Sequence, residues 1–338
     1  MVAEPTEGMV GAVKAIWALP LAAILCDLEE ARASTRSSTT AEPLRVDGPP
    51  PKNRLAFHSI TALRANPLGL LELLTLSYRS RIHRSEVPAL LDNFAGLGFA
   101  AELTPAFGRV GPMLEIQPLS VLRLWATYQV AAYFGTFDLF QSFPTPGSDY
   151  SDDRLDTLGA LEAPEANYPT TGTQVTFGAN LQAKVGPIAV RSGFRLVRPD
   201  YDLRDGDQTF YDQFYDLLVL DEGWYFTNDA DLLFVTDFGL AAGLRWTASR
   251  VFYDGWEAPT GSPMPDDAAF PTSTHRLGPF LAYNFDKGPP GVFFNNPTAI
   301  LIVNWWLEHP YRTGQEVTQA LPYIALGFAF NGDIWVEN

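Results

Sequence analysis

The sequence lacks several features that would assign the protein to a common functional class. It has one cysteine, Cys26, and four histidines among 338 residues. A membrane-spanning helix needs about 20 consecutive apolar residues, and the longest apolar block, residues 15–26, is shorter than that. Charged residues make up 18% of the chain, whereas about 25% is usual in soluble proteins. The sequence therefore predicts neither a helical membrane anchor nor an ordinary soluble surface.

The N-terminal segment is typical of a secretory signal peptide. Lys14 precedes the apolar block at residues 15–26, and residues 31–33 (Ala-Arg-Ala) have the small-x-small form of a cleavage site. We predict a signal peptide over residues 1–33. Cleavage at its end would remove Cys26, and a cysteine-free mature chain suits an oxidising compartment and excludes thiol chemistry or a Cys-ligated metal.

An uninterrupted alternation of apolar and polar residues runs through residues 173–185. The odd positions include Val175, Phe177 and Leu181, and the even positions include Gln174, Asn180 and Gln182. Successive side chains of a β-strand point to opposite faces of the sheet, so this segment has one apolar and one polar face. A barrel built from such strands has a mean hydropathy near zero, and the value for this chain is −0.02.

The same alternation recurs along the chain and predicts an all-β, antiparallel up-and-down barrel of about ten strands, with a range of 8–12. An extra hairpin within residues 211–235 would give twelve strands. An even number returns both ends of the barrel to the same side of the membrane. The predicted strands cover residues 70–80, 106–117, 122–134, 173–185, 188–196, 224–235, 240–252, 275–284, 297–307 and 321–330.

Short and long connections alternate between these strands. Tight turns are predicted at residues 117–119, 185–187 and 236–238, and long links at 136–170, 198–222 and 253–273. This asymmetry matches the short periplasmic turns and long extracellular loops of a transmembrane barrel. Aromatic residues gather at predicted strand ends, where interfacial girdles are expected. They include Tyr133, Phe134, Phe137, Trp224, Tyr225, Phe252, Tyr253, Trp256, Trp305 and Trp306.

On these features the chain resembles Gram-negative outer-membrane β-barrel proteins over residues 70–330, including a segment at 323–330 similar to the final-strand signal of that group. The resemblance implies an outer-membrane location with extracellular loops. It also implies outer-membrane lipid, lipopolysaccharide and the barrel-assembly machinery as partners. The Ser/Thr- and Pro-rich residues 34–69 are then a disordered periplasmic extension, and residues 331–338 a C-terminal tail.

The charges are divided between predicted loops and strands. The net charge is −16, which argues against nucleic-acid binding, and residues 136–170, 198–222 and 252–273 hold nineteen of the 39 acids. The polar faces of the strands carry mainly basic residues: Arg79, Arg109, Arg123, Lys184, Arg191, Arg195 and Arg245, with Arg276 as a further candidate, against Glu115.

Two interpretations of these lumen-facing bases fit the sequence. In the first, the arginines bind backbone carbonyls, Glu115 and inward-folded acidic loops, and plug the lumen. In the second, they line an open pore that favours anions. About eight strands are filled by their own side chains and open porins need about sixteen, so a barrel of about ten strands favours the plugged state.

One loop has carboxylates spaced for a hard cation. Asp200, Asp202, Asp205 and Asp207 lie close together around Gly206, and calcium or magnesium prefers several oxygen ligands on a flexible loop. A divalent cation bound there could bridge to anionic lipopolysaccharide. The alternative is that these acids are solvated and repel neighbouring molecules.

Catalytic signatures are scarce. The sequence has no G-x-S-x-G and no H-E-x-x-H motif, and no cofactor is expected. His309, with Glu308 or an aspartate of a neighbouring loop, is the best-placed candidate for acid–base chemistry. Three hypotheses remain: a structural barrel or narrow channel without chemistry, a barrel whose loops bind a surface ligand or lipopolysaccharide, and a lipid-active enzyme that uses His309. The first is preferred, so we expect the protein not to be an enzyme.

Overall fold

The structure is a computed structural model that describes residues 50–160, 167–254, 256, 270–285 and 294–337. The predicted signal peptide, residues 1–33, lies outside the described residues, as do residues 34–49 of the predicted extension. In the described part, no helix has the length and apolar character needed to cross a membrane.

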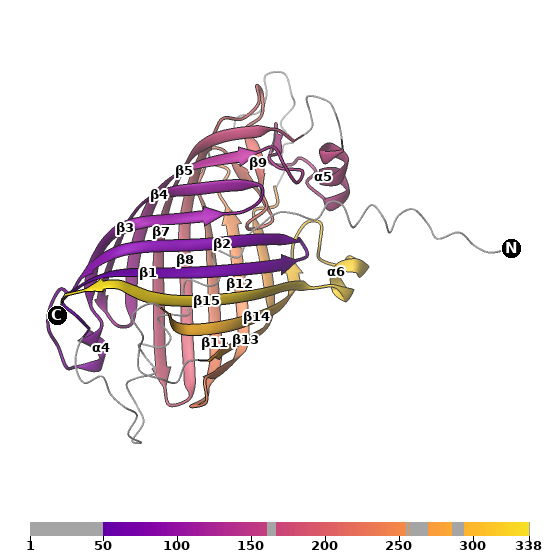
Figure 1. The fold of residues 1–338 in the computed structure, drawn as a ribbon. Coiled ribbons are helices and arrows are strands. Elements are labelled where there is room, and N and C mark those ends of the chain that lie inside the picture. Colours follow the sequence, from indigo (N-terminus) through magenta and orange to yellow (C-terminus); the bar gives the residue numbers. More distant parts are fainter. Residues whose placement is uncertain (1–49, 161–166, 255, 257–269, 286–293, 338) are drawn as a thin grey trace.

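Twelve antiparallel strands form one closed barrel (Figure 1). The wall strands follow one another around the barrel in the order in which they occur in the chain. The ring closes where the last strand, β15, pairs with the first, β1. The strands are β1 (Asn53–Ala65), β2 (Gly69–Ser80), β3 (Phe94–Leu103), β4 (Phe107–Leu119), β5 (Leu122–Phe134), β7 (Pro169–Val185), β8 (Ile188–Tyr201), β11 (Tyr225–Val235), β12 (Leu240–Val251), β13 (Ser273–Asn284), β14 (Asn295–Glu308) and β15 (Tyr323–Val336).

The junction of β1 with β15 closes the barrel. Its register places Ser59 opposite Phe330 and Leu63 opposite Leu326, and the pairing continues from Arg54 to Ala65. On its other side β1 pairs with β2 from Asn53 to Arg64. A closed ring leaves no edge strand, so the backbone N–H and C=O groups of the wall are paired within the barrel.

The predicted parity of side chains is confirmed. On β7, Phe177 and Leu181 are 49% and 54% exposed, whereas Gln174 and Asn180 are 5% and 3% exposed. The outward face of the wall is therefore apolar and the inward face polar, the reverse of a water-soluble barrel. This is the distribution of a barrel with lipid outside and a polar interior.

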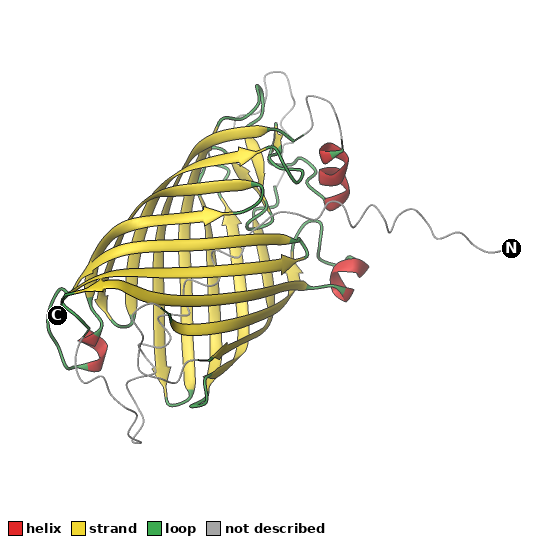
Figure 2. Cartoon of the chain, viewed as in Figure 1, coloured by secondary structure: helices red, strands yellow, loops and turns green. Residues whose placement is uncertain are grey.

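The two ends of the barrel differ. Short turns at residues 120–121 and 186–187, where Gly186 has a φ of 59°, lie at the end that holds α4 (Pro88–Leu91) and the C-terminus. The helices α5 (Asp152–Gly159) and α6 (Glu316–Ala320) lie beyond the opposite end (Figure 1). Figure 2 shows strands forming the whole wall, with helices only beyond its ends. We call the end with α5 and α6 the loop end.

Two barrel strands were not predicted, so the count is twelve and not about ten. Residues 53–65 form β1, which makes the prediction of a disordered extension over residues 34–69 wrong for this part. Residues 94–103 form β3. Residues 331–336 continue β15 and are not a tail. The extra hairpin considered within residues 211–235 is not in the wall, because β9 (Thr209–Asp212) and β10 (Leu217–Leu220) belong to a separate sheet.

The aromatic clusters at strand ends divide between the two faces. Phe134 and Trp305 point outward and are exposed, as expected for an interfacial girdle, whereas Tyr133, Tyr225 and Trp306 point inward and are buried. The girdle prediction is therefore wrong for these three residues. Neighbouring positions in a strand face opposite sides, so a cluster of adjacent aromatics supplies both the girdle and the interior.

The outward apolar face predicts a specific response to a charge. Replacing Leu114, an exposed residue at the middle of β4, by lysine should lower the free energy of unfolding in lipid vesicles by about 2–4 kcal/mol, because the ammonium would face the bilayer interior. Thr171→Lys, near the loop end of β7, should cost less than about 1 kcal/mol. Equal stability of Leu114→Lys and the parent protein in denaturant titrations would show that this face does not meet lipid.

Candidate functional site: the closed barrel lumen

Arginines extend along the interior of the barrel. Of the predicted lumen residues, Arg79, Arg109, Arg123, Arg191, Arg195 and Arg245 are buried, and Arg276 is buried as well. Lys184 lies one residue before the end of β7, is only partly buried, and forms no ion pair in the described part of the chain. The structure therefore groups the arginines inside the wall and leaves Lys184 at its rim.

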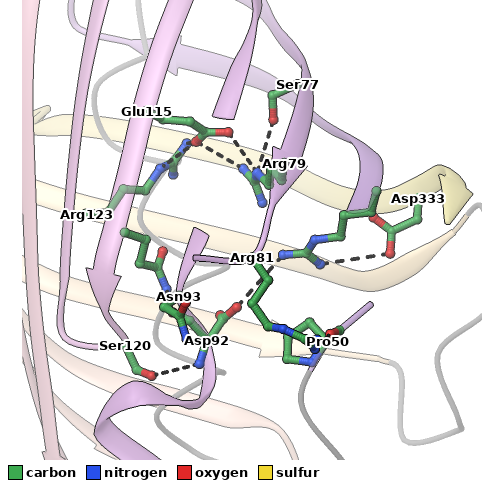
Figure 3. A network of polar contacts seen from close by, with 12 residues as sticks. Pro50, Ser77, Arg79, Arg81, Asp92, Asn93, Glu115, Ser120, Arg123 and Asp333 are labelled. Atoms are coloured by element: carbon green, nitrogen blue, oxygen red, sulfur yellow. Dashed lines mark hydrogen bonds and ion pairs between the residues drawn. The ribbon is translucent and has the colours of Figure 1, made fainter. Parts of the chain in front are cut away.

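Glu115 of β4 binds two of these arginines, Arg79 of β2 and Arg123 of β5 (Figure 3). Its carboxylate accepts hydrogen bonds from Arg79 Nε at 2.8 Å and from Arg123 Nη2 at 2.6 Å. Gly96 on β3 makes room for it, since a Cβ at this position would lie 2.8 Å from Glu115 Cγ. One carboxylate between two guanidinium groups leaves one positive charge in excess.

A second carboxylate is shared in the same way on β11. Asp231 on β11 accepts from Arg245 Nε at 2.6 Å and from Arg191 Nε at 3.1 Å. Both guanidinium groups also lie over the ring of Phe280, at 4.7 Å for Arg245 and 5.2 Å for Arg191. Asp229, two residues earlier on the same face, lies 3.9 Å from Arg195.

The loop end of the lumen is closed by segments of the long loops. A small sheet with the order β10-β9-β6 combines the two strands of residues 209–220 with β6 (Ser142–Phe143) from the preceding loop. Every residue of these three strands is buried. We call this sheet, with residues 213–216 of its β9–β10 turn, the plug.

Aromatic rings pack the plug against the wall. Phe140, which precedes β6, lies 4.8 Å from Tyr133 of β5 and 5.1 Å from Phe210 of β9, centroid to centroid. Tyr201 of β8 lies 5.0 Å from Phe210 in an edge-to-face arrangement. Such pairs add to the stabilisation from apolar burial, so the plug is a packed part of the interior.

The β9–β10 turn of the plug is bound to the wall through its polar groups. Arg64 of β1 donates to the backbone oxygen of Gln213 at 2.9 Å. Asp212 accepts from the hydroxyl of Tyr225 on β11 at 2.9 Å and from the backbone N–H of Phe214 at 2.7 Å. These bonds satisfy buried polar groups that would otherwise oppose closure.

The guanidinium group of Arg312 binds residues of three outer loops. We call Arg312, Asp216 and His309 together the latch. Arg312 donates to Asp216 of the plug, to Asp152 of α5 at 2.9 and 3.0 Å, and to Asn66 of the β1–β2 turn at 3.1 Å. Burial alone would raise the pKa of Asp216, but the adjacent Arg312 guanidinium holds that pKa well below its usual range. The same carboxylate accepts from Tyr211 at 2.7 Å.

His309 belongs to the latch, where its Nε2 lies 3.4 Å from a carboxylate oxygen of Asp216. Its Nδ1 accepts from the backbone N–H of Tyr311 at 3.1 Å, so its Nε2 carries the proton and donates to the backbone oxygen of Asp216 at 2.9 Å. Burial lowers the pKa of His309. Glu308 points elsewhere and accepts from Ser273 at 2.7 Å. The predicted His309–Glu308 pair therefore does not form, because consecutive residues leave the strand in different directions.

The predicted cation site does not assemble. Asp200 and Asp202 are exposed, and Asp207 accepts instead from the hydroxyl of Ser142. Within the described ranges, no three His, Cys, Asp or Glu side chains are arranged to hold a metal ion. Asp205 likewise joins no such group, so the described structure does not bring the predicted carboxylates together.

Several lumen residues were missed by the sequence analysis. Asp229 and Asp231 share one face of β11, and their spacing of two residues is a usable signal, but this strand had the weakest alternation. Arg64 lies in the segment taken for an extension. Asp216 and Arg312 are 96 residues apart, and no local pattern could have paired them.

A cavity lies in the half of the lumen formed by β1 to β8. Phe214 and Tyr215 of the plug line it at the loop end. The wall contributes apolar side chains, including Ile60 and Met113, as well as amide, hydroxyl and guanidinium groups. Among the described residues, loop segments, ion pairs and this cavity share the interior.

No protein-family model matches the chain, and no curated protein matches it. Among solved structures, it is similar to the KdgM porin at 9% identity over 83% of this chain and 100% of that chain, with a TM-score of 0.33. It is also similar to the translocator domain of the autotransporter NalP from Neisseria meningitidis (10% identity, 83% and 87% covered, TM-score 0.35). A third is Omp33 of Acinetobacter baumannii (11%, 85% and 100%, 0.32). The likeness extends to the fold alone.

The shared carboxylate of Glu115 yields a stability prediction. Glu115→Gln should lower the free energy of unfolding by about 3–5 kcal/mol, because two buried guanidinium groups would lose their counter-charge. Glu308→Gln removes a carboxylate whose side chain is 59% exposed and lies near His275. This change should lower the free energy of unfolding by less than about 1 kcal/mol. Similar losses for both variants in denaturant titrations would contradict the role of Glu115.

The latch should weaken in two steps on acidification. Folding lowers the pKa of His309 below the value of about 6.5 that histidine has in the unfolded chain. The stabilisation that neutral His309 contributes is therefore lost as the pH falls below about 6.5. The pKa of Asp216 is also lowered, and its contribution is lost only below about pH 4. Amide hydrogen exchange of residues 209–220, corrected for the intrinsic pH dependence, should show both steps.

His309→Gln keeps a donor for the Asp216 backbone oxygen and should abolish the first step while preserving the second. Asp216→Asn should leave these amides poorly protected even at neutral pH. Unchanged protection in Asp216→Asn would mean that the latch does not hold the plug.

Proposed function

We propose that the protein is an outer-membrane channel that its own outer loops hold closed, and that it catalyses no reaction. The observation that carries the proposal is the plug, a buried sheet made from loop segments and tied down by Arg312. A purely structural barrel of twelve strands would be expected to fill its interior from the wall. Loops that fold in and share one charged contact at Arg312 provide a way to open.

The membrane location is supported by the outward face of the barrel. Its exposed residues are large and apolar, as on β4, where Val110, Leu114 and Ile116 alternate with buried side chains that include Arg109 and Glu115. An apolar surface of this extent is rare on soluble monomers. A closed strand ring is one of two structures that satisfy the backbone in lipid. The predicted export signal favours the outer membrane among bilayers that hold such barrels.

The interior charge supports a preference for anions. Among the described residues, nine arginines and five carboxylates are buried. The carboxylates are Glu115, Asp212, Asp216, Asp229 and Asp231. A pore with an excess of guanidinium groups favours negative solutes. Twelve strands enclose a bore between that of a filled eight-stranded barrel and that of an open porin, so conduction should be small.

Planar-bilayer recordings test this proposal. The parent protein should be almost silent, and Arg312→Met should open steps of conductance, because three loops lose their shared contact. In a salt gradient the reversal potential should show anion preference. Arg154→Met, an exposed arginine on α5, is the matched control and should stay silent. Heat-modifiable electrophoretic mobility verifies that each variant is folded.

A second variant separates the latch from the channel. Deletion of residues 209–220 removes β9 and β10 and should open the lumen even if aromatic packing keeps Arg312→Met closed. Silence of both folded variants would overturn the proposed channel. Large, unselective conductance of the parent protein would overturn the proposed closure.

A further inference from the structure

Several side chains that line the cavity under the plug have buried polar atoms without a hydrogen-bond partner among the described residues. Trp125, Thr127 and Gln129 project from the same face of β5, and Gln174 of β7 lies opposite Gln129 in the strand register. Trp125 Nε1, Thr127 Oγ1, Gln129 Nε2 and Gln174 Oε1 are buried and form no hydrogen bond within the described structure. A buried polar group without a partner is costly, so this row of atoms is suited to bind a polar guest.

Trp125 is positioned by a glycine on the neighbouring strand. It pairs with Gly178 of β7, and a Cβ at Gly178 would lie 2.0 Å from the indole ring. The absence of that Cβ lets the ring, including Nε1, lie against the backbone of β7. The guanidinium group of Arg195 lies 5.9 Å from the same ring, which places a positive charge beside the unpartnered indole donor.

The charged groups that line the cavity are mostly cationic. Arg109, Arg123 and Arg195 line it, with Glu102 as the carboxylate among the lining residues. Glu102 accepts from Arg109 at 3.3 Å, and Arg123 shares Glu115 with Arg79. Outside the lining, Asp229 lies 3.9 Å from Arg195. An anionic group in the cavity would therefore meet more positive than negative charge.

The remaining wall is aliphatic. Ile60, Leu73, Met113 and Val197 line the cavity from four different strands. A guest that satisfies both parts of the lining has a short apolar body and one anionic end that accepts hydrogen bonds.

We propose that this cavity binds a short-chain aliphatic carboxylate, with its anionic end toward Trp125, Thr127 and Gln129. The apolar body lies against Ile60 and Met113. The proposal deepens the proposed channel function and depends on it for the route of entry, because Phe214 and Tyr215 cover the cavity at the loop end.

Fluorine NMR of a trifluoromethyl-labelled butanoate with the folded full chain in detergent micelles tests the proposal. The probe should show saturable binding, and the matched neutral butanamide should bind at least about tenfold more weakly, because it lacks the charge that the guanidinium groups attract. Gln129→Met and Thr127→Val should each weaken butanoate binding by about fivefold or more. Asn180→Leu is the control, because Asn180 is a buried lumen amide on β7 that does not line the cavity.

The same titration in Arg312→Met separates entry from recognition. Butanoate binding that appears only when the latch is broken still supports the site. Absence of saturable binding in both proteins, or equal binding of butanoate and butanamide, would overturn it and leave a cavity occupied by water only. Conductance of Arg312→Met without butanoate binding would refute this site while the channel proposal stands.

Discussion

Closure of the barrel by the pairing of β1 with β15 is the constraint on which the rest of the structure depends. Once the ring is closed, each wall residue faces either outside or inside, and parity along the strand decides which. Apolar residues such as Leu114 then form the outer face, and arginines such as Arg245 are enclosed. Enclosure makes counter-charges necessary, and Glu115, Asp231 and the inward loops supply them.

Strands with a strong contrast between their two faces were predictable from the sequence, and β5 was predicted with the bounds it has in the structure. β1 was missed because its contrast is weak: Ser59 and Thr61 face outward, where Glu72 accepts hydrogen bonds from both, and Ile60 faces inward. β3 was missed because glycine and alanine fill most of its inward face, so Leu97, Phe99 and Leu103 on the outward face do not alternate with distinctly polar side chains. Alternation detects a strand only where both faces carry distinctive side chains.

The interior was predictable only in part. Parity indicated which arginines face inward, but not that one carboxylate would serve two of them, because Asp231 and Arg191 meet only through the register of β11 with β8. The acidic loops gave no local sign of the plug, because Asp216 is paired by Arg312 from a distant loop. Contacts between loops form only once the barrel has brought the loops together. Local sequence patterns therefore cannot predict them.

The central claim is that lipid surrounds the wall and a closed, polar interior lies within it. A nitroxide scan of residues 175–185 in vesicles tests this most directly, after replacement of Cys26 so that each label is unique. Odd positions should be accessible to oxygen dissolved in the bilayer, and even positions should be shielded from both oxygen and a water-soluble relaxation agent. Even positions open to the water-soluble agent would contradict the closed lumen, and odd positions open to it would contradict the membrane-embedded wall.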